Sequence, residues 1–181
     1  MKKVFLSIFG ILAIAAGSFA QAGNNQISPA AEFALPTGDA SDVNKIGIGV
    51  TVKGLYGIGE AGQITFTTGL LTAGAKNEYK DWLGADKITS TMIPLLAGYR
   101  HNFKGFYAEP QIGYGIYGSK IKGGDYDSKD SQGAFTWAAG VGYVFNSFEA
   151  GIRYQNMHKD GESSGFFGVR LGYLFSLGSS K

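Results

Sequence analysis

Residues 106–117 read FYAEPQIGYGIY, a stretch in which apolar side chains alternate with small or polar ones. The even positions are apolar, and the odd positions include Glu109, Gln111 and Gly113. Side chains alternate between the two faces of a β-strand, so this rhythm predicts a strand with one apolar face. Residues 165–176 repeat the pattern, with Arg170 on the small and polar face. A soluble barrel turns its apolar face inward, whereas glycines and charges suit the crowded interior of a membrane barrel whose outer face meets lipid.

The composition agrees with this interpretation. The chain has 181 residues, 44% of them hydrophobic, and its mean hydropathy of -0.01 is that of a chain in which half of every strand is polar or small. Glycine weakens a strand and is therefore kept mainly where neighbouring atoms leave no space for a side chain. The 29 glycines of this chain predict a narrow, tightly filled interior. There are no cysteines, which excludes a disulfide framework and a lipid anchor on cysteine.

The N-terminus has the pattern of a secretory signal peptide. Lys2 and Lys3 precede an apolar segment, and small residues suit cleavage after Ala20 or after Ala22. A retained membrane helix needs about 20 apolar residues, and this segment is shorter. We therefore expect a signal peptide over 1–20 and one barrel domain over 21–181. Without Lys2 and Lys3 the 16 basic residues become 14, equal to the 14 acidic ones, so nothing predicts a nucleic-acid partner.

Eight strand candidates follow one another along the mature chain. Their connections alternate between short turns (56–62, 101–104 and 146–147) and longer polar segments (37–44, 73–87, 118–132 and 157–164). Outer-membrane barrels have short periplasmic turns and long extracellular loops. The sequence thus predicts an all-β fold, an eight-stranded antiparallel up-and-down transmembrane β-barrel with both termini in the periplasm. The predicted strands are Ile27–Pro36, Lys45–Tyr56, Gln63–Thr72, Ile88–Arg100, Gly105–Tyr117, Gly133–Phe145, Phe148–Asn156 and Gly165–Ser176.

Aromatic residues are expected at both ends of the outward face, as two girdles at the membrane interfaces. A soluble periplasmic barrel, the alternative, would not gather them at strand ends. The periplasmic girdle comprises Tyr56, Tyr99, Phe106, Tyr143, Phe145, Phe148, Tyr173 and Phe175, and the outer girdle Phe135, Trp137, Tyr154 and Phe167.

The same alternation points a set of charged and amide side chains into the lumen. A one-residue slip would put Arg153 and Arg170 in lipid, at about 2 to 4 kcal/mol each near the midplane. An eight-stranded barrel has room only for side chains, so these groups should pair as a buried network that argues against an open pore. The predicted lumen network comprises Glu32, Lys53, Arg100, Glu109, Gln111, Glu149, Arg153 and Arg170, with Gln155 on the same face.

Several short segments resemble those of a known family. They are Gly98-Tyr99-Arg100, residues 105–115, Ala139-Gly140-Val141-Gly142-Tyr143 and Leu171-Gly172-Tyr173-Leu174-Phe175. Through them the whole mature chain resembles the small eight-stranded outer-membrane barrels, the OmpX-like and OmpA-transmembrane-like group, in the form common among Bacteroidetes. Tyr173-Leu174-Phe175 resembles the terminal signal read by the barrel-assembly machinery in that family, although Ser176–Lys181 follow it here.

Motifs that carry chemistry are weak in this chain. Residues 57–62 match G-x-G-x-x-G, but β-branched residues follow where a dinucleotide site needs a helix, so a turn is expected. Residues 124–130 gather three carboxylates, yet Lys129 breaks the EF-hand pattern and a solvated loop is expected. His101 and His158 fall at opposite ends of the barrel, and no serine is spaced for a His–Ser pair. We expect no catalytic residue, metal or cofactor.

The function expected from the sequence is a non-enzymatic structural or adhesion role carried by the extracellular loops, in the cell outer membrane. Tyr79, Trp82 and Tyr126 are candidate loop contacts, with Trp82 equally consistent with an anchor at the membrane interface. Expected partners are outer-membrane lipids, lipopolysaccharide, the barrel-assembly machinery and an unidentified extracellular protein. The alternatives are a narrow porin-like conduit and a lipid A-modifying enzyme.

Overall fold

The chain forms a barrel of eight long antiparallel strands in a computed structural model that describes residues 25–123 and 126–177, without the side chains of Tyr126 and Asp127. The strands are β1 (Gln26–Thr37), β2 (Gly47–Ile58), β3 (Gly62–Gly74), β4 (Lys87–Phe103), β5 (Phe106–Gly123), β6 (Tyr126–Phe145), β7 (Phe148–Lys159), β8 (Glu162–Tyr173) and the short β9 (Phe175–Ser176). Two short helices are α2 (Asp39–Val43) and α3 (Asn77–Leu83).

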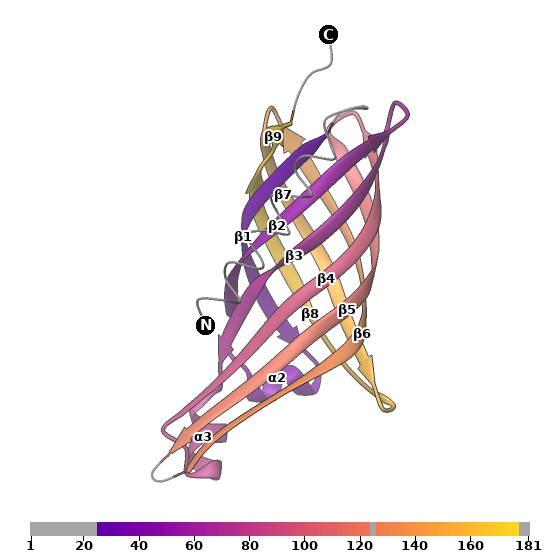
Figure 1. The fold of residues 1–181 in the computed structure, drawn as a ribbon. Coiled ribbons are helices and arrows are strands. Elements are labelled where there is room, and N and C mark those ends of the chain that lie inside the picture. Colours follow the sequence, from indigo (N-terminus) through magenta and orange to yellow (C-terminus); the bar gives the residue numbers. More distant parts are fainter. Residues whose placement is uncertain (1–24, 124–125, 178–181) are drawn as a thin grey trace.

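Each strand pairs with its neighbour in sequence, and β1 pairs with both β2 and β8. This last pairing closes the sheet into a barrel with tilted strands (Figure 1). The β1–β8 register matches Glu32 with Arg170, and β9 continues it by pairing Ile27 with Phe175. The eight-stranded antiparallel up-and-down barrel predicted from the alternation is confirmed.

The barrel is apolar outside and polar inside, the reverse of a soluble protein. Outward side chains such as Val50, Ile112 and Ile152 are 66%, 63% and 56% exposed. Inward side chains such as Arg100 and Glu149 are only 1% and 2% exposed. A continuous apolar outer surface of this extent needs a non-aqueous neighbour, and lipid supplies one.

Aromatic side chains lie at both ends of the apolar outer surface. At the end where β1 begins and β8 finishes, the rings of Phe106 and Tyr143 are 4.7 Å apart. Toward the other end, Tyr154 lies 5.7 Å from Trp137 and 5.1 Å from Phe167, measured between ring centroids. From Phe106 to Ile116, ten residues of β5 at about 3.3 Å each and a tilt of about 40° span about 25 Å along the barrel axis, the height of the apolar band of an outer-membrane barrel.

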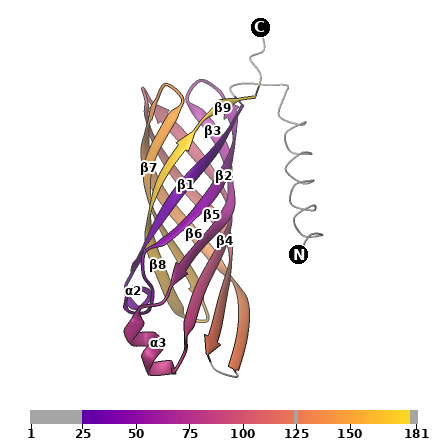
Figure 2. The same ribbon diagram turned by 90° about the vertical axis from the view of Figure 1, so that its left-hand side faces the viewer.

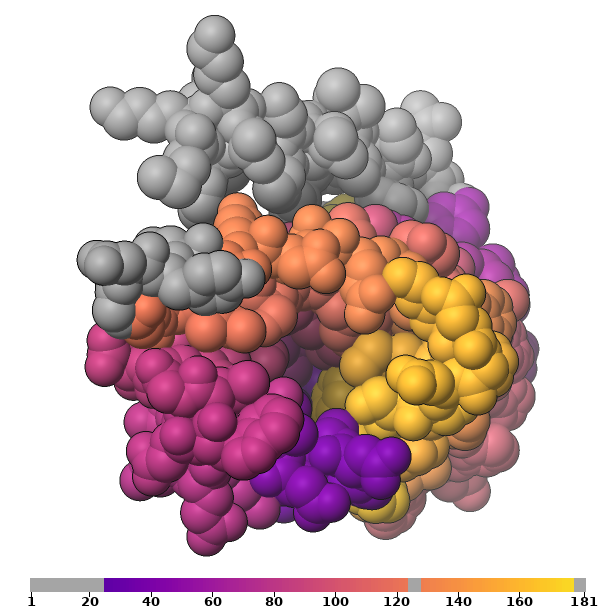
Figure 3. Space-filling view, turned by 90° about the horizontal axis from the view of Figure 1, so that it is seen from below, coloured from indigo at the N-terminus to yellow at the C-terminus, as the bar shows by residue number. Residues whose placement is uncertain are grey.

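The two ends of the barrel differ. The terminal end, where β1 begins and β8 finishes, has the short connections 59–61, 104–105 and 146–147. The opposite end, called the helix end, carries α2 and α3 and the projecting parts of β4, β5 and β6 (Figure 2). The two helical connections touch, since the Lys76 N–H donates to the Val43 carbonyl at 2.8 Å. Figure 3 looks onto this end, with the α3 segment in magenta beside the α2 segment in indigo. No helix in the described part of the chain is long and apolar enough to cross a membrane.

Two of the four long connections predicted from the sequence are wrong. Residues 118–132 are mostly strand, because β5 and β6 stay paired from Gly118 opposite Ser131 to Gly123 opposite Tyr126. Residues 157–164 form a tight hairpin whose turn residues Asp160 and Gly161 have φ of 51° and 88°. Positive φ at both central residues is typical of a type I′ turn, for which Asp-Gly is a preferred pair.

Candidate functional site

The lumen holds all eight side chains that the alternation assigned to it, and each is buried. They come from strands β1, β2, β4, β5, β7 and β8, because inward positions recur at every second residue of each strand. They are Glu32, Lys53, Arg100, Glu109, Gln111, Glu149, Arg153 and Arg170, and Gln155 is buried beside them.

Glu149 is the centre of the largest charged group. One carboxylate oxygen accepts hydrogen bonds from Arg100 Nη2 at 2.6 Å and from the Tyr107 hydroxyl at 2.7 Å. The other lies 2.8 Å from Arg170 Nη1 and accepts from Ser28 Oγ at 3.0 Å. Its side chain is 0% exposed, so water cannot replace any of these partners. A buried carboxylate with this set of donors satisfies the requirement that buried charges be paired and hydrogen-bonded.

Glu109 is the second carboxylate of the same charged group. Its Oε2 lies 2.6 Å from Lys53 Nζ and 3.0 Å from Arg100 Nη2, so Arg100 bridges the two carboxylates. Its Oε1 accepts from Thr65 Oγ1 and Gln111 Nε2, each at 2.9 Å. Three cations thus face two carboxylates within this group.

A second ion pair joins the network through one amide. Arg153 Nε donates to Glu32 Oε1 at 2.8 Å, and Arg153 Nη1 donates to Gln111 Oε1 at 3.3 Å. Because Gln111 also donates to Glu109, its side chain links the two charged groups. The described lumen therefore contains one connected network of four cations and three carboxylates.

Tyr107, Ser28 and Thr65 were not among the predicted network residues, although they bond its carboxylates. The Arg100 guanidinium also lies 3.8 Å from the centroid of the Tyr107 ring, a cation–π contact. Tyr107 shares the odd-numbered face with Glu109, so the alternation contained the signal. The ring of Tyr107 covers Gly142 on β6 and Gly151 on β7, which leaves no space for side chains there.

The charged part of the interior is closely packed. A void of about 20 Å³ lies among Lys53, Gln111, Arg153 and Arg170, and this volume holds about one water molecule. Closer to the helix end the lumen contains an apolar group of Ala34, Leu71, Met92 and Phe166, with Tyr117 packed against it. The ion-pair network and the apolar group thus occupy successive levels of the lumen.

The candidate loop contacts lie at the helix end. Tyr79 and Trp82 are both on α3, where their rings stack at 6.0 Å between centroids, and Trp82 is 77% exposed. Tyr126 is the first residue of β6, and its side chain lies outside the described residues. Asp125, part of the acidic segment 124–130, is also outside them. The described residues contain no group of three or more His, Cys, Asp or Glu side chains that could hold a metal ion.

One expectation about histidine is wrong. His158 does have a serine within hydrogen-bond distance, because β7 and β8 pair His158 directly with Ser163, and their Nδ1 and Oγ atoms are 3.0 Å apart. The two-residue turn at Asp160-Gly161 brings these positions together, whereas a longer loop would have separated them. Both side chains lie on the outer face at the helix end.

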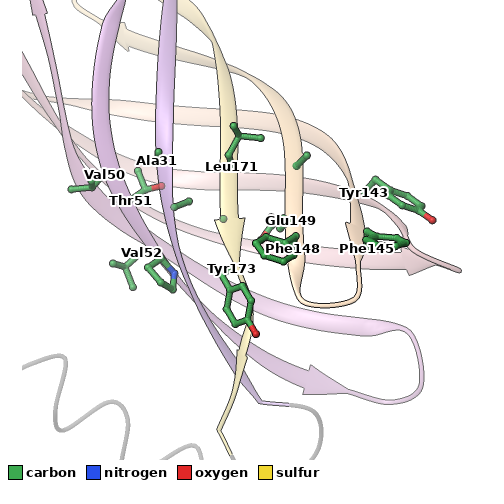
Figure 4. A pocket seen from close by; sticks show the side chains of 14 residues that line it. Ala31, Val50, Thr51, Val52, Tyr143, Phe145, Phe148, Glu149, Leu171 and Tyr173 are labelled. Atoms are coloured by element: carbon green, nitrogen blue, oxygen red, sulfur yellow. The ribbon is translucent and has the colours of Figure 1, made fainter.

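A recess of about 690 Å³ lies on the outer surface near the terminal end, between β1, β2, β6, β7 and β8 (Figure 4). The small residues Ala31 and Ala150 and the aromatic residues Phe148 and Tyr173 are among those that line it. Its outward side chains are apolar and belong to the lipid-facing band, so the recess is suited to acyl chains rather than to polar chemistry.

Comparisons with known proteins agree with this architecture. The family model for the outer membrane protein beta-barrel domain matches residues 5–175. Among solved structures, Ail, the attachment invasion locus protein of Yersinia pestis, is 16% identical with a TM-score of 0.62, over 84% of this chain and 99% of that one. Neisserial surface protein A is 14% identical with a TM-score of 0.56, over 85% and 97%. The N-terminal barrel of Pseudomonas aeruginosa OprF is 15% identical with a TM-score of 0.54, over 85% and 100%. No curated protein matches the chain.

Proposed function

Because the chain belongs to the family of outer membrane protein β-barrel domains, we propose that it is a non-enzymatic surface protein whose barrel anchors a binding surface outside the cell. The observation that carries this proposal is the difference between the two ends. The projecting strands, the helices α2 and α3 and the exposed Trp82 gather at the helix end, while the connections that the structure describes at the terminal end are short turns. A structural or adhesive role uses this arrangement, since binding residues concentrate on connections held by a rigid scaffold.

The proposal assigns the helix end to the outside of the cell. Outer-membrane barrels keep short turns in the periplasm and longer connections outside. The terminal end has the two-residue turns Lys104-Gly105 and Asn146-Ser147, and β1 begins and β8 finishes there (Figure 1). We further propose that residues 1–20 are a cleaved signal peptide and that the barrel-assembly machinery reads Tyr173-Leu174-Phe175.

The filled lumen favours an anchoring role over a conduit. An ion crossing the barrel would have to displace Arg100 and Lys53 from Glu109, to which they are bonded at 3.0 and 2.6 Å. Removing one partner of a buried ion pair costs about 3 to 5 kcal/mol. That cost makes the interior a structural core.

The stacked pair Tyr79 and Trp82 is the proposed contact of the surface. Aromatic residues dominate the energetics of protein interfaces because they bury a large area with little loss of conformational freedom. The adjacent Leu83 is 41% exposed and extends the apolar part of this patch. Ail of Yersinia pestis has been solved in complex with the heparin analogue sucrose octasulfate, which supports the idea that a small barrel of this fold can serve as a binding protein.

The test is adhesion of bacteria that display the protein to surfaces coated with fibronectin, mucin or heparin. We expect the protein to add binding to at least one surface, and the double variant Y79A/W82A to weaken it at least 30-fold, the effect of a hot spot worth about 2 kcal/mol. The control is I46A, which removes a side chain that is 62% exposed in the other long connection. Binding that is never gained, or that Y79A/W82A leaves unchanged, contradicts the proposal.

The orientation has a separate test on intact cells. External protease should cleave within residues 75–86, and residues 101–104 should stay protected. Cleavage at 101–104 instead would show that the terminal end faces outward and would reject the proposed topology.

A lipid-modifying enzyme is the second candidate, and one observation favours it. The His158–Ser163 pair has the spacing of a base and a nucleophile. The other ring nitrogen has no hydrogen-bond partner among the described side chains, whereas catalytic imidazoles are usually oriented by a third group. Mass spectrometry of lipid A after overexpression separates the two candidates. A mass change that S163A abolishes would establish the enzyme.

A further inference from the structure

Four lysines lie on the outer face of the sheet that projects at the helix end. We call Lys87 on β4, Lys120 and Lys122 on β5, and Lys129 on β6 the lysine row. All four side chains are exposed. They occupy outward positions, since the alternate residue Ile88 is only 5% exposed and faces the interior. The row thus continues the surface that faces lipid lower on the barrel.

The outer face changes in the same way along each of the three strands. Apolar residues give way to small or hydroxyl residues and then to lysine. From the apolar band outward, the positions are Ile93, Thr91, Thr89 and Lys87 on β4; Ile116, Gly118, Lys120 and Lys122 on β5; and Phe135, Gly133, Ser131 and Lys129 on β6. The lysines therefore form a cationic border above the apolar band.

Strand pairing places these like charges opposite one another. Lys87 is paired with Lys122, and Lys120 is paired with Lys129. Like charges directly across a strand pair are destabilising unless an anion lies between them. Among the described side chains, the ion pairs outside the lumen include none of these four ammonium groups. Asp127 is opposite Lys122 in the register, and counting its charge the row still has a net charge of about +3.

The row lies at the height of lipid head groups. With about 2.5 Å of axial rise per residue, Lys120 lies about 10 Å beyond Ile116, and Lys87 and Lys129 lie about 15 Å beyond Ile93 and Phe135. This is outside the hydrocarbon layer, and the long lysine stems reach back toward the lipid surface.

We propose that the lysine row binds the phosphate groups of the phosphorylated glycolipid in the outer leaflet. A glycolipid whose acyl chains pack on the apolar band next to Ile116 would bring its phosphates to these ammonium groups. This continuity with the lipid-facing surface favours a lipid over a soluble polyanion, which would need no apolar band beneath its site. The inference rests on the proposed orientation with the helix end outside.

The test measures lipid binding to the protein extracted from outer membranes into detergent micelles. Native mass spectrometry gives the affinity for bisphosphorylated lipid A and for its dephosphorylated form. We expect phosphorylated lipid A to bind more tightly. The variant K120Q/K129Q should weaken that binding about 30-fold, because each lysine near an anionic lipid surface contributes about fivefold. K120R/K129R, which keeps the charge, should bind like the unaltered protein.

The matched control is K76Q/K80Q, which removes the same charge from the helix end but outside the row. Equal affinity for the two forms of lipid A would overturn the proposal, as would equal losses in K76Q/K80Q and K120Q/K129Q. If K120Q/K129Q lowers binding to heparin but not to lipid A, the row is a site for soluble polyanions and the lipid assignment is wrong. Lipid binding in micelles does not depend on orientation, so its failure is distinct from failure of the protease test.

Discussion

Replacing Glu149 by glutamine should strongly destabilise the barrel, because this carboxylate is the centre of the largest charged group in the lumen. The substitution keeps the size of the side chain but removes the charge that Arg100, Arg170 and Lys53 face at 2.6, 2.8 and 3.7 Å. The glutamine also places an amide N–H donor against an arginine guanidinium, which is itself a donor and so cannot accept a hydrogen bond from it. Breaking a buried ion pair by neutralising one partner costs about 3 to 5 kcal/mol, and we expect a loss in that range.

The assay is urea unfolding in detergent micelles, followed by the fluorescence of the chain's two tryptophans, Trp82 and Trp137. Trp137, in the apolar band, reports loss of the barrel. The midpoint should fall while the slope with denaturant stays unchanged. The control is E60Q, at an exposed turn, which should shift stability by less than about 0.5 kcal/mol.

A second variant tests the cause of the loss. Adding K53M to E149Q removes one of the cations left in excess, so the double variant should recover about 1 to 3 kcal/mol relative to the sum of the two single effects. An E149Q protein within about 1 kcal/mol of the unaltered one would refute the argument that this network stabilises the closed barrel. Strictly additive single effects would refute the proposed coupling.

Three other predictions concern packing and transport. Gly142→Val should lower the free energy of unfolding by about 1 to 3 kcal/mol in the same assay, because the Tyr107 ring occupies the space that the new side chain needs. The control Gly54→Val should be nearly neutral, because a Cβ at that position meets no atom within 4 Å. Similar losses in the two variants would contradict the packing argument. Phe166→Ala should cost about 3 to 5 kcal/mol through a cavity in the apolar group, and a loss below 1 kcal/mol would show that this layer is loosely packed. In planar bilayers the protein should give no stable conductance steps, and steps that persist in E149Q would revive the conduit.

The strand rhythm was sufficient to predict the barrel, because lipid outside and a crowded lumen inside impose opposite polarity on alternate residues. Beyond the membrane this contrast disappears. In the outer part of β5, polar residues occupy both faces of the strand, with Ser119 on one face and Lys120 and Lys122 on the other. The alternation therefore does not distinguish this part of the strand from a loop. The hairpin at Asp160-Gly161 is hard to predict for a different reason, since polar residues on both sides of the turn give it the composition of a longer loop.

The alternation along a strand predicts which face of the sheet a side chain occupies. It does not predict where around the barrel the side chain lies or which residue it contacts. It assigned Glu149 to the lumen, yet nothing in the sequence indicates that its carboxylate meets Ser28, which is 121 positions away. The His158–Ser163 contact depends on the length of one turn, which fixes the register between β7 and β8. Partners across a closed sheet follow only from the register of every strand pair.

The side-chain bonds across the β1–β8 junction can form only after the last long strand is present. Arg170, near the end of the chain, donates to Ser28, near its start, across 142 positions of sequence. Contacts between such distant residues cannot form until the last strand has joined the first, and folds dominated by them form slowly. A chain that stops before β8 keeps the Glu149 carboxylate but lacks the Arg170 guanidinium beside it. The junction therefore distinguishes a complete chain from a truncated one, and incomplete barrels should be lost during biogenesis.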